Sequence, residues 1–271
     1  MQKRLSTTII GLPLVILLVN RGGWPLLLAC LLVSLVGLRE LYRAFSKADK
    51  PIHIVGYVFT VCYFITVFMF GPQQWLIVAV TLFVIVVQAC LAIFFTRLSM
   101  EDIIITVYGF LYVPLLLSFI ILVREHELGQ YYVWLIFISS FGCDTFAYLT
   151  GTTIGRRKLT NSPSPKKSVE GLIGGVVGAA LLGVVYGYFV ARFADPGMVD
   201  SIIINALVIS LCGAVFSIIG DLAASAIKRR TEIKDFGNVF PGHGGVIDRI
   251  DSVIMVAPIV YLVMNVLVLT S

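Results

Sequence analysis

Long runs of apolar residues, separated by short polar segments, follow one another along the whole chain. The pattern predicts nine membrane-spanning helices, at residues 5–20, 24–44, 52–70, 74–95, 103–123, 131–151, 170–192, 202–225 and 252–270. Most of these runs approach the ~20 apolar residues that a helix needs to cross a bilayer. Because the runs are continuously apolar rather than alternating, helices are favoured over the strands of a barrel. We therefore expect an all-α, polytopic integral membrane protein.

Composition excludes an ordinary water-soluble domain. Only 13% of the 271 residues are charged, whereas soluble domains carry about 25%. The five cysteines all fall in apolar runs without a pairing pattern, so we expect small buried thiols. The first run follows Lys3 and Arg4 without a small-residue cleavage site, and we interpret it as a retained helix.

The distribution of Lys and Arg predicts the orientation in the membrane. Of the 20 such residues, all but Arg21, Arg124 and Arg192 fall on the side of the N-terminus. By the positive-inside rule the N-terminus is cytoplasmic and the C-terminus lies outside. The net charge of +5 is explained in this way, and no nucleic-acid partner is expected. A short chain of this type is expected in a bacterial inner membrane.

Polar chemistry is concentrated in the second half of the chain. We expect residues 1–130 to form a scaffold of five spans. Residues 131–271 are expected to form a catalytic region of four spans with two cytoplasmic loops, 151–169 and 220–252. This concentration in one half argues against a secondary transporter, the alternative from another class, which is built from two related halves.

Two acidic residues fall within apolar runs. Asp144 lies late in the sixth expected span, and Asp221 follows Gly220 in the eighth. A carboxylate at membrane depth costs roughly 3 kcal/mol, so it needs a cation, a metal or a water-filled cavity. For Asp144 the alternative is packing through hydrogen bonds to neighbouring helices or a position at the membrane interface. For Asp221 it is a buried ion pair with Lys228, two helical turns further along the chain. Gly220 would allow a ligand or another backbone to approach closely.

Asp248 and Asp251 stand three residues apart at the entry to the last span. On a helix both carboxylates share one face, and they repel each other unless a cation lies between them. Mg²⁺ binds in this way, through one or two carboxylates and substrate phosphates. The alternative is a solvated helix start with an aspartate cap. We predict Asp221, Asp248 and Asp251 as metal ligands, with room for a second metal ion.

Two glycine- and lysine-containing loops are candidates for binding phosphate. In Pro241-Gly242-His243-Gly244-Gly245 the backbone N–H groups can turn inward and hold an anion, helped by the positive end of the helix that follows. In the other loop Lys167 is placed to neutralise phosphate and Ser168 to bind phosphate or metal. The alternatives are an ordinary turn and a loop that contacts anionic lipid heads.

The candidate catalytic residues are Asp144, Lys167, Asp221 and Asp248, and the candidate substrate-binding residues are Ser168, Lys228, Arg229, Lys234, His243, Gly244, Gly245 and Arg249. The role of His243, as a general acid or a hydrogen-bond partner, is left open. Arg39 and Glu40 are interpreted as an ion pair at the end of the second span, without a function.

These residues resemble the signature of the phosphatidate cytidylyltransferase, or CDP-diglyceride synthase, family. The signature appears as Ser225, Lys228-Arg229, Lys234-Asp235, Pro241-Gly242-His243-Gly244-Gly245 and Asp248-Arg249-Ile250-Asp251. The upstream pattern is matched by Ser164, Pro165, Lys167, Ser168, Glu170 and Gly171, and Asp144-Thr145-Phe146-Ala147-Tyr148 also looks like the family. The resemblance covers roughly residues 144–251, and the first five spans match only in hydrophobicity and number.

The resemblance implies a reaction in which CTP and phosphatidic acid give CDP-diacylglycerol and pyrophosphate. It also implies Mg²⁺ dependence, nine membrane helices and a homodimer, with Asp221 and Asp248 at the positions of the family's metal-ligand pair. The residues fit this chemistry, because two polyanions can react only where their charge is neutralised. The alternative among enzymes is a cytidylyltransferase for another lipid phosphate, such as a prenyl-glycerol phosphate.

Overall fold

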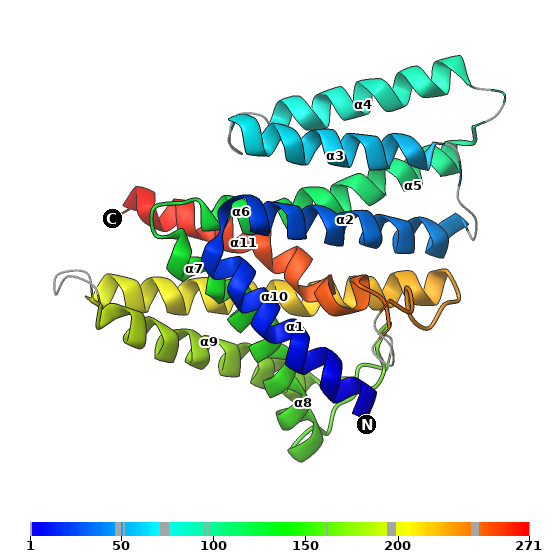
Figure 1. The fold of residues 1–271 in the computed structure, drawn as a ribbon. Helices are drawn as coiled ribbons and strands as arrows, with labels where there is room; N and C mark the ends of the chain where they lie inside the picture. Colours follow the sequence, from blue (N-terminus) through cyan, green and yellow to red (C-terminus); the bar gives the residue numbers. More distant parts are fainter. Residues whose placement is uncertain are drawn as a thin grey trace. The chain divides into compact units, whose positions relative to one another are not determined.

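The fold of the chain is helical, as the apolar runs predicted. The computed structural model describes residues 2–46, 50, 52–70, 76–94, 96, 98–160, 162–193, 199–239 and 244–270. The helices, shown in Figure 1, are α1 (Gln2–Arg21), α2 (Gly23–Ser46), α3 (His53–Phe70), α4 (Leu76–Ile93), α5 (Met100–Phe110), α6 (Leu116–Arg124), α7 (Gly129–Phe137), α8 (Cys143–Thr153), α9 (Val169–Ala191), α10 (Val199–Arg230) and α11 (Ile247–Thr270). Within these residues no strand occurs, and one isolated bridge joins Lys158 to Ser168.

Many of these helices are long and apolar enough to cross a membrane. Within the described ranges, seven meet that condition: Gly23–Phe45, His53–Phe70, Met100–Arg124, Gly129–Thr153, Val169–Ala191, Ser201–Arg230 and Ile247–Leu267. The expected first and fourth spans correspond to shorter apolar helices, Gly11–Arg21 and Val78–Ile93. The protein is therefore an integral membrane protein. The count of nine spans and the orientation stay predictions.

Two of the spans contain a π-helical turn. One, Leu111–Leu115, joins α5 to α6 and contains Pro114, and the other, Ile138–Gly142, joins α7 to α8. A proline lacks a backbone N–H group, so a locally widened turn accommodates it without ending the helix. The second π turn directly precedes Cys143 and Asp144, and widened turns of this kind often occur at functional sites.

The chain divides into two compact units. The first unit contains Met1–Leu122 and Thr231–Arg249, and the second contains Val123–Arg230 and Ile250–Ser271. The predicted division at residue 130 is a division by role and stays a prediction. By packing, however, most of the polar segment after α10 belongs with the N-terminal helices.

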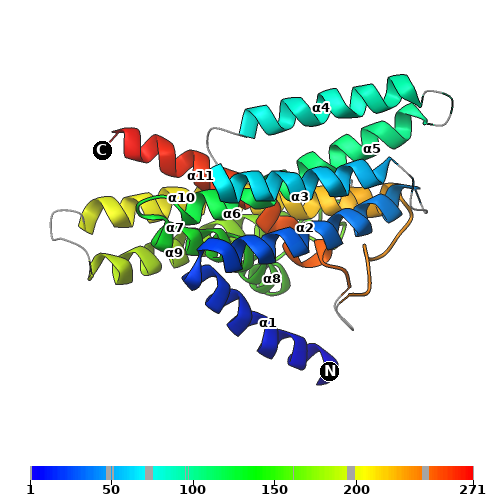
Figure 2. The same cartoon turned by 45° about the horizontal axis from the view of Figure 1, so that its top comes forward.

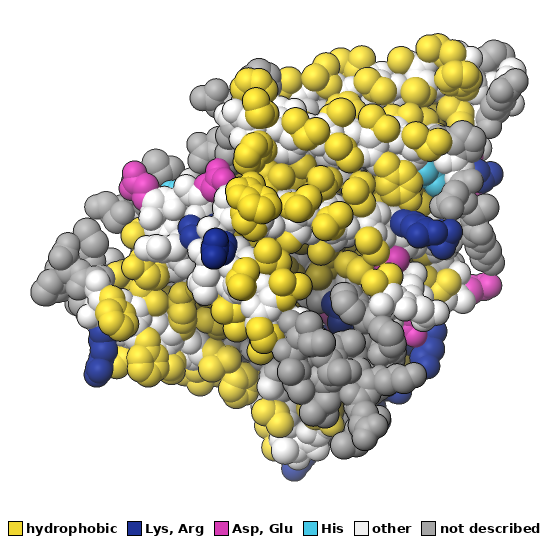
Figure 3. Space-filling view, viewed as in Figure 1, with side chains coloured by type: hydrophobic (Ala, Val, Ile, Leu, Met, Phe, Trp, Pro, Cys, Tyr) yellow, Lys and Arg dark blue, Asp and Glu magenta, His cyan; other side chains and the backbone are white. Residues whose placement is uncertain are grey.

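The first unit is built around aromatic side chains. Tyr42 of α2 is fully buried, stacks on His53 with ring centroids 4.2 Å apart, and donates a hydrogen bond to the carbonyl of Thr106. Phe83 and Phe110 form a second buried pair, with centroids 4.3 Å apart. Over α3 and α4 the visible surface consists mainly of hydrophobic side chains (Figure 3). A hydrophobic exterior of this kind is what contact with lipid requires.

Small residues let the helices of the second unit pack closely. Helices α9 and α10 lie side by side in both views of the ribbon (Figures 1 and 2). On α9, Gly178 faces the ring of Phe146 of α8, and a side chain at Gly175 would meet the carbonyl of Cys143 at 2.8 Å. Close helix contacts through small residues are typical of membrane proteins. The resulting packing holds α8 and α10, which carry Asp144 and Asp221, against α9.

Candidate active site

Three acidic side chains from three helices lie within electrostatic range of one another in the second unit. Asp144 lies in the first turn of α8, Asp221 in α10 and Asp251 in α11. Asp251 interacts electrostatically with both of the other carboxylates, and Asp144 does so with Asp221. Asp251 is buried, Asp221 is partly buried and Asp144 is exposed. Such a concentration of like charge needs cations, because the carboxylates otherwise repel one another.

Lys167 is a cation in direct contact with this cluster. Its Nζ atom forms an ion pair with Oδ2 of Asp221, and the two side chains are 24% and 25% exposed. Lys167 also lies within electrostatic range of Asp144, and Lys228 of α10 lies within range of Asp251. Two predicted catalytic acids and two predicted phosphate-binding cations thus belong to one partly exposed group of charges in the second unit.

The loop between α8 and α9 folds back on itself, and its backbone hydrogen bonds position Lys167. The N–H group of Leu159 donates to the carbonyl of Lys167 at 3.0 Å, and that of Lys167 donates to Ser164 at 3.1 Å. At the base of the loop, the Glu170 carboxylate accepts N–H groups from Arg156 and Arg157 at 3.1 Å each. The lysine therefore projects from a loop whose backbone is held at several points.

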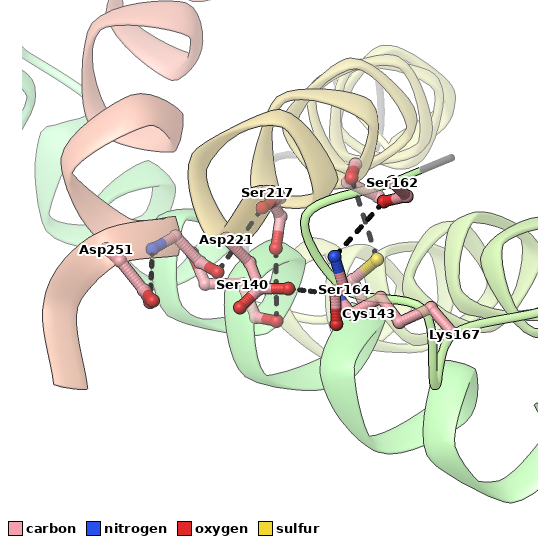
Figure 4. A network of polar contacts seen from close by, with 10 residues as sticks. Ser140, Cys143, Ser162, Ser164, Lys167, Ser217, Asp221 and Asp251 are labelled. Carbon is pink, nitrogen blue, oxygen red and sulfur yellow. Dashed lines mark hydrogen bonds and ion pairs between the residues drawn. The ribbon is translucent and has the colours of Figure 1, made fainter. Parts of the chain in front are cut away.

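Hydrogen bonds join the helices that carry the acids. The Ser252 hydroxyl donates to the carbonyl of Ser217 at 3.3 Å, and the Ser217 hydroxyl donates to the carbonyl of Ser140 at 3.5 Å. Figure 4 shows this network beside Asp221, Asp251 and Lys167. A side chain at Gly220 would lie 2.5 Å from the carbonyl of Asp251. The expected close approach at Gly220 is confirmed, and the group that approaches is the backbone of α11.

Ser168 caps a helix in this structure. Its buried hydroxyl accepts the N–H group of Gly171 at 3.2 Å, from an extended backbone conformation directly before α9. This is the geometry of an N-cap, in which the hydroxyl satisfies one of the free N–H groups of the first helical turn. The prediction that Ser168 binds phosphate or metal stays a prediction.

We expect Ser168→Ala to lower the free energy of unfolding by about 1 kcal/mol, since the cap is lost. Unfolding by increasing SDS in mixed detergent micelles measures the change. Thr152→Ala is the control, because the exposed Thr152 hydroxyl donates only to carbonyls of its own helix. Unchanged stability together with a raised KM for CTP would instead identify Ser168 as a substrate ligand.

The fourth predicted acid, Asp248, lies in the first unit. Its Oδ2 atom accepts N–H groups from Phe236 at 2.8 Å and Gly245 at 3.0 Å. Asp221 and Asp251 belong to the second unit. The predicted pairing of Asp248 with these residues around a metal therefore stays a prediction. Asp248 has in addition a local role that the sequence did not indicate, because it holds together the segment between α10 and α11.

At the start of α11, backbone N–H groups bind acidic side chains of the protein. Val246 and Ile247 donate theirs to the carboxylate of Glu40, at 2.9 and 3.0 Å. Gly245 donates to Asp248. A helix N-terminus attracts negative charge, and here side chains of the protein supply it. The predicted binding of an anion by the loop 241–245 stays a prediction, because residues 241–243 lie outside the described residues. Sequence reasoning gave Glu40 no function; an acid late in an apolar run was the one signal available.

The other predicted substrate-binding residues belong to the stretch of sequence from residue 228 to residue 249. Arg229, Lys234 and Arg249 are exposed, and the Nε atom of Arg229 donates to the carbonyl of Pro163 at 3.4 Å. Gly244 has a positive φ of 84° that favours glycine. His243 lies outside the described residues. The substrate contacts of these residues, and of Gly245 and Lys228, stay predictions.

Comparison with known proteins decides the family. Residues 2–267 match the Cytidylyltransferase family. The chain belongs to this family. The resemblance inferred from the signature is therefore confirmed, and it extends through the N-terminal helices as well as the signature region.

Several bacterial proteins named phosphatidate cytidylyltransferase are similar to this chain. The Bacillus subtilis (strain 168) protein is 37% identical over 152 residues, which is 56% of this chain and 54% of the relative. The Rickettsia conorii protein is 33% identical over 203 residues, or 69% and 86% of the two chains. The Staphylococcus epidermidis (strain RP62A) protein is 28% identical over 264 residues, or 96% and 97%. With the Bacillus relative, the matched region spans about half of each chain.

Proposed function

We propose that this protein transfers CMP from CTP to phosphatidic acid, releasing pyrophosphate and forming CDP-diacylglycerol. Membership of the cytidylyltransferase family supports the use of CTP, and the names of the relatives support the lipid acceptor. The apolar helices support a substrate that resides in the membrane. The observation that carries the proposal is the Lys167–Asp221 ion pair within electrostatic reach of two further carboxylates.

The arrangement suits attack by one phosphate on another. An oxygen of the lipid phosphate forms a bond to the α-phosphorus of CTP, and the bond from that phosphorus to the bridging oxygen of pyrophosphate breaks. The nucleophile is already an anion, so no strong protein base is needed. The main requirement is positive charge where the two polyanions meet. Lys167 and Lys228 supply fixed charge in the second unit.

The acids in the second unit fit the role of Mg²⁺ ligands. Among the residues that the structure describes, no group of three or more His, Cys, Asp or Glu side chains is placed to hold a metal ion. Mg²⁺ in nucleotide sites commonly uses only one or two carboxylates together with substrate phosphates. Asp221 and Asp251 offer such oxygens, and Asp248 remains a predicted ligand. The ion would neutralise phosphate charge in the transition state.

We also propose a cellular setting for this activity. The Lys and Arg distribution supports a cytoplasmic N-terminus, a C-terminus on the other side and a site open to the cytoplasm, where CTP is available. Bacterial relatives support a bacterial inner membrane. The resemblance to the family supports a homodimer and leaves room for a second metal ion.

The test is an assay of purified full-length protein in micelles with radiolabelled CTP. We expect labelled CDP-diacylglycerol with phosphatidic acid and Mg²⁺, loss of product with EDTA, and recovery when Mg²⁺ is restored in excess. Activity without any divalent cation would contradict the metal proposal. Equal or greater turnover with an ether-linked isoprenoid glycerol phosphate would assign the other lipid. Substrate flux across vesicles without CTP turnover would favour a transporter.

A further inference from the structure

Glu40 is an acid buried within a membrane helix, and the chemistry proposed above does not use it. It lies in α2, and 5% of the residue is exposed. One carboxylate oxygen accepts the N–H group of Val246, and the other accepts that of Ile247, 206 and 207 residues away in the chain. Burial of a charged group is unfavourable unless hydrogen bonds compensate it. Here the compensation comes from the start of α11.

The surroundings of Glu40 are shaped to receive its carboxylate. A side chain at Gly245 would lie 2.5 and 2.6 Å from the two carboxylate oxygens, and one at Gly237 would collide with Oε1. Val246 and Ile247 are themselves buried. At positions 237 and 245, therefore, only glycine fits beside the acid.

Glu40 is connected to Asp248 through this backbone. The N–H group of Gly245 donates a hydrogen bond to Asp248, and the N–H groups of the next two residues, Val246 and Ile247, donate to Glu40. Asp248 also accepts the N–H group of Phe236, on the other side of the loop. Two carboxylates, one from α2 and one from α11, thus hold the backbone of residues 236 and 245–247 in place.

We propose that Glu40 is a positioning residue, which sets the first turn of α11 and thereby the orientation of the Asp248 carboxylate. The inference rests on the proposed function, since it takes Asp248 to act in the reaction. A purely structural acid would contribute to stability alone. A positioning residue changes turnover and the response to Mg²⁺ in protein that is still folded.

The main test compares Glu40→Gln with wild-type protein in detergent micelles by hydrogen exchange and by turnover. The Gln amide can accept one N–H group but turns its NH₂ toward the other, so one buried N–H is left without an acceptor. We expect exchange in residues 245–249 to accelerate about tenfold or more. We also expect kcat to fall by about tenfold or more, with a smaller change in the KM for CTP.

A change in the loop tests the same contact from its other side, with control variants elsewhere in the chain. Gly237→Ala adds a methyl group against the Glu40 carboxylate and should reproduce both effects, whereas Gly11→Ala meets no atom within 4 Å and should produce neither. Ser34→Ala removes another fully buried polar group of α2 and controls for a general loss of stability. Glu40→Asp keeps the charge and should recover part of the activity.

The results of these experiments distinguish a positioning role of Glu40 from a purely structural role. Unchanged exchange in Glu40→Gln would show that Glu40 does not hold the helix start. Accelerated exchange with wild-type kcat and Mg²⁺ dependence would show a structural role only, and the proposal would be wrong. The variant Asp248→Asn tests the proposed role of Asp248 separately. Wild-type turnover in this variant would rule out that role, while hydrogen exchange in Glu40→Gln would still show whether Glu40 holds the start of α11.

Discussion

Asp221→Asn is expected to reduce CMP transfer by about a thousandfold or more while the protein still folds and inserts. The side chain pairs with Lys167 and lies near Asp144 and Asp251. An amide has the same shape but no charge, so it cannot serve as an anionic ligand. Stabilisation of phosphate charge by a metal is worth several kcal/mol, and each ~1.4 kcal/mol is a factor of ten in rate. Initial rates at saturating CTP and phosphatidic acid measure the loss.

The matched control for this change is Glu127→Gln. It removes one negative charge from an exposed residue of the second unit, in the turn before α7, and should leave the rate near that of wild type. Binding of Mn²⁺, followed by electron paramagnetic resonance without turnover, separates a lost ligand from a lost fold. Near-normal rates and Mn²⁺ binding in Asp221→Asn would remove the metal assignment.

Lys167→Met should reduce kcat/KM for CTP by about 10²–10³-fold, the usual loss when one electrostatic contact to the transition state is removed. The flexible methionine keeps most of the apolar stem, so the change is mainly one of charge. Lys167→Arg retains the charge and should recover part of the activity. Steady-state kinetics with varied CTP at saturating phosphatidic acid measure these effects.

The neighbouring Lys166 provides the control, because it is exposed and carries the same charge in the same loop. Lys166→Met should retain activity near the wild-type level, and a loss equal to that of Lys167→Met would indicate a general effect of loop charge. The double variant Lys167→Met with Asp221→Asn should be little worse than Asp221→Asn alone, since groups that act together are not additive. Full additivity would mean that the two residues act separately.

The helical membrane fold and the positions of its unusual acidic residues follow from local sequence. Apolar runs of membrane length allow little besides helices, because backbone N–H and C=O groups have no partners in lipid. The cost of charge in that setting singles out Asp144 and Asp221 by their positions within apolar runs. Gly220 beside Asp221 pointed to a close approach, and the backbone of α11 is found there. These conclusions depend on each residue and its neighbours in the chain.

Contacts between distant segments had to come from the tertiary structure. No spacing rule relates Glu40 to Val246 and Ile247, 206 and 207 residues away, so a buried acid at the end of α2 looked like a local ion pair. Ser168 and Lys167 are adjacent, yet one caps α9 and the other reaches Asp221. Which neighbour meets a substrate and which completes a helix depends on the direction that the folded loop gives each side chain. That direction is set by packing between elements, which local patterns do not encode.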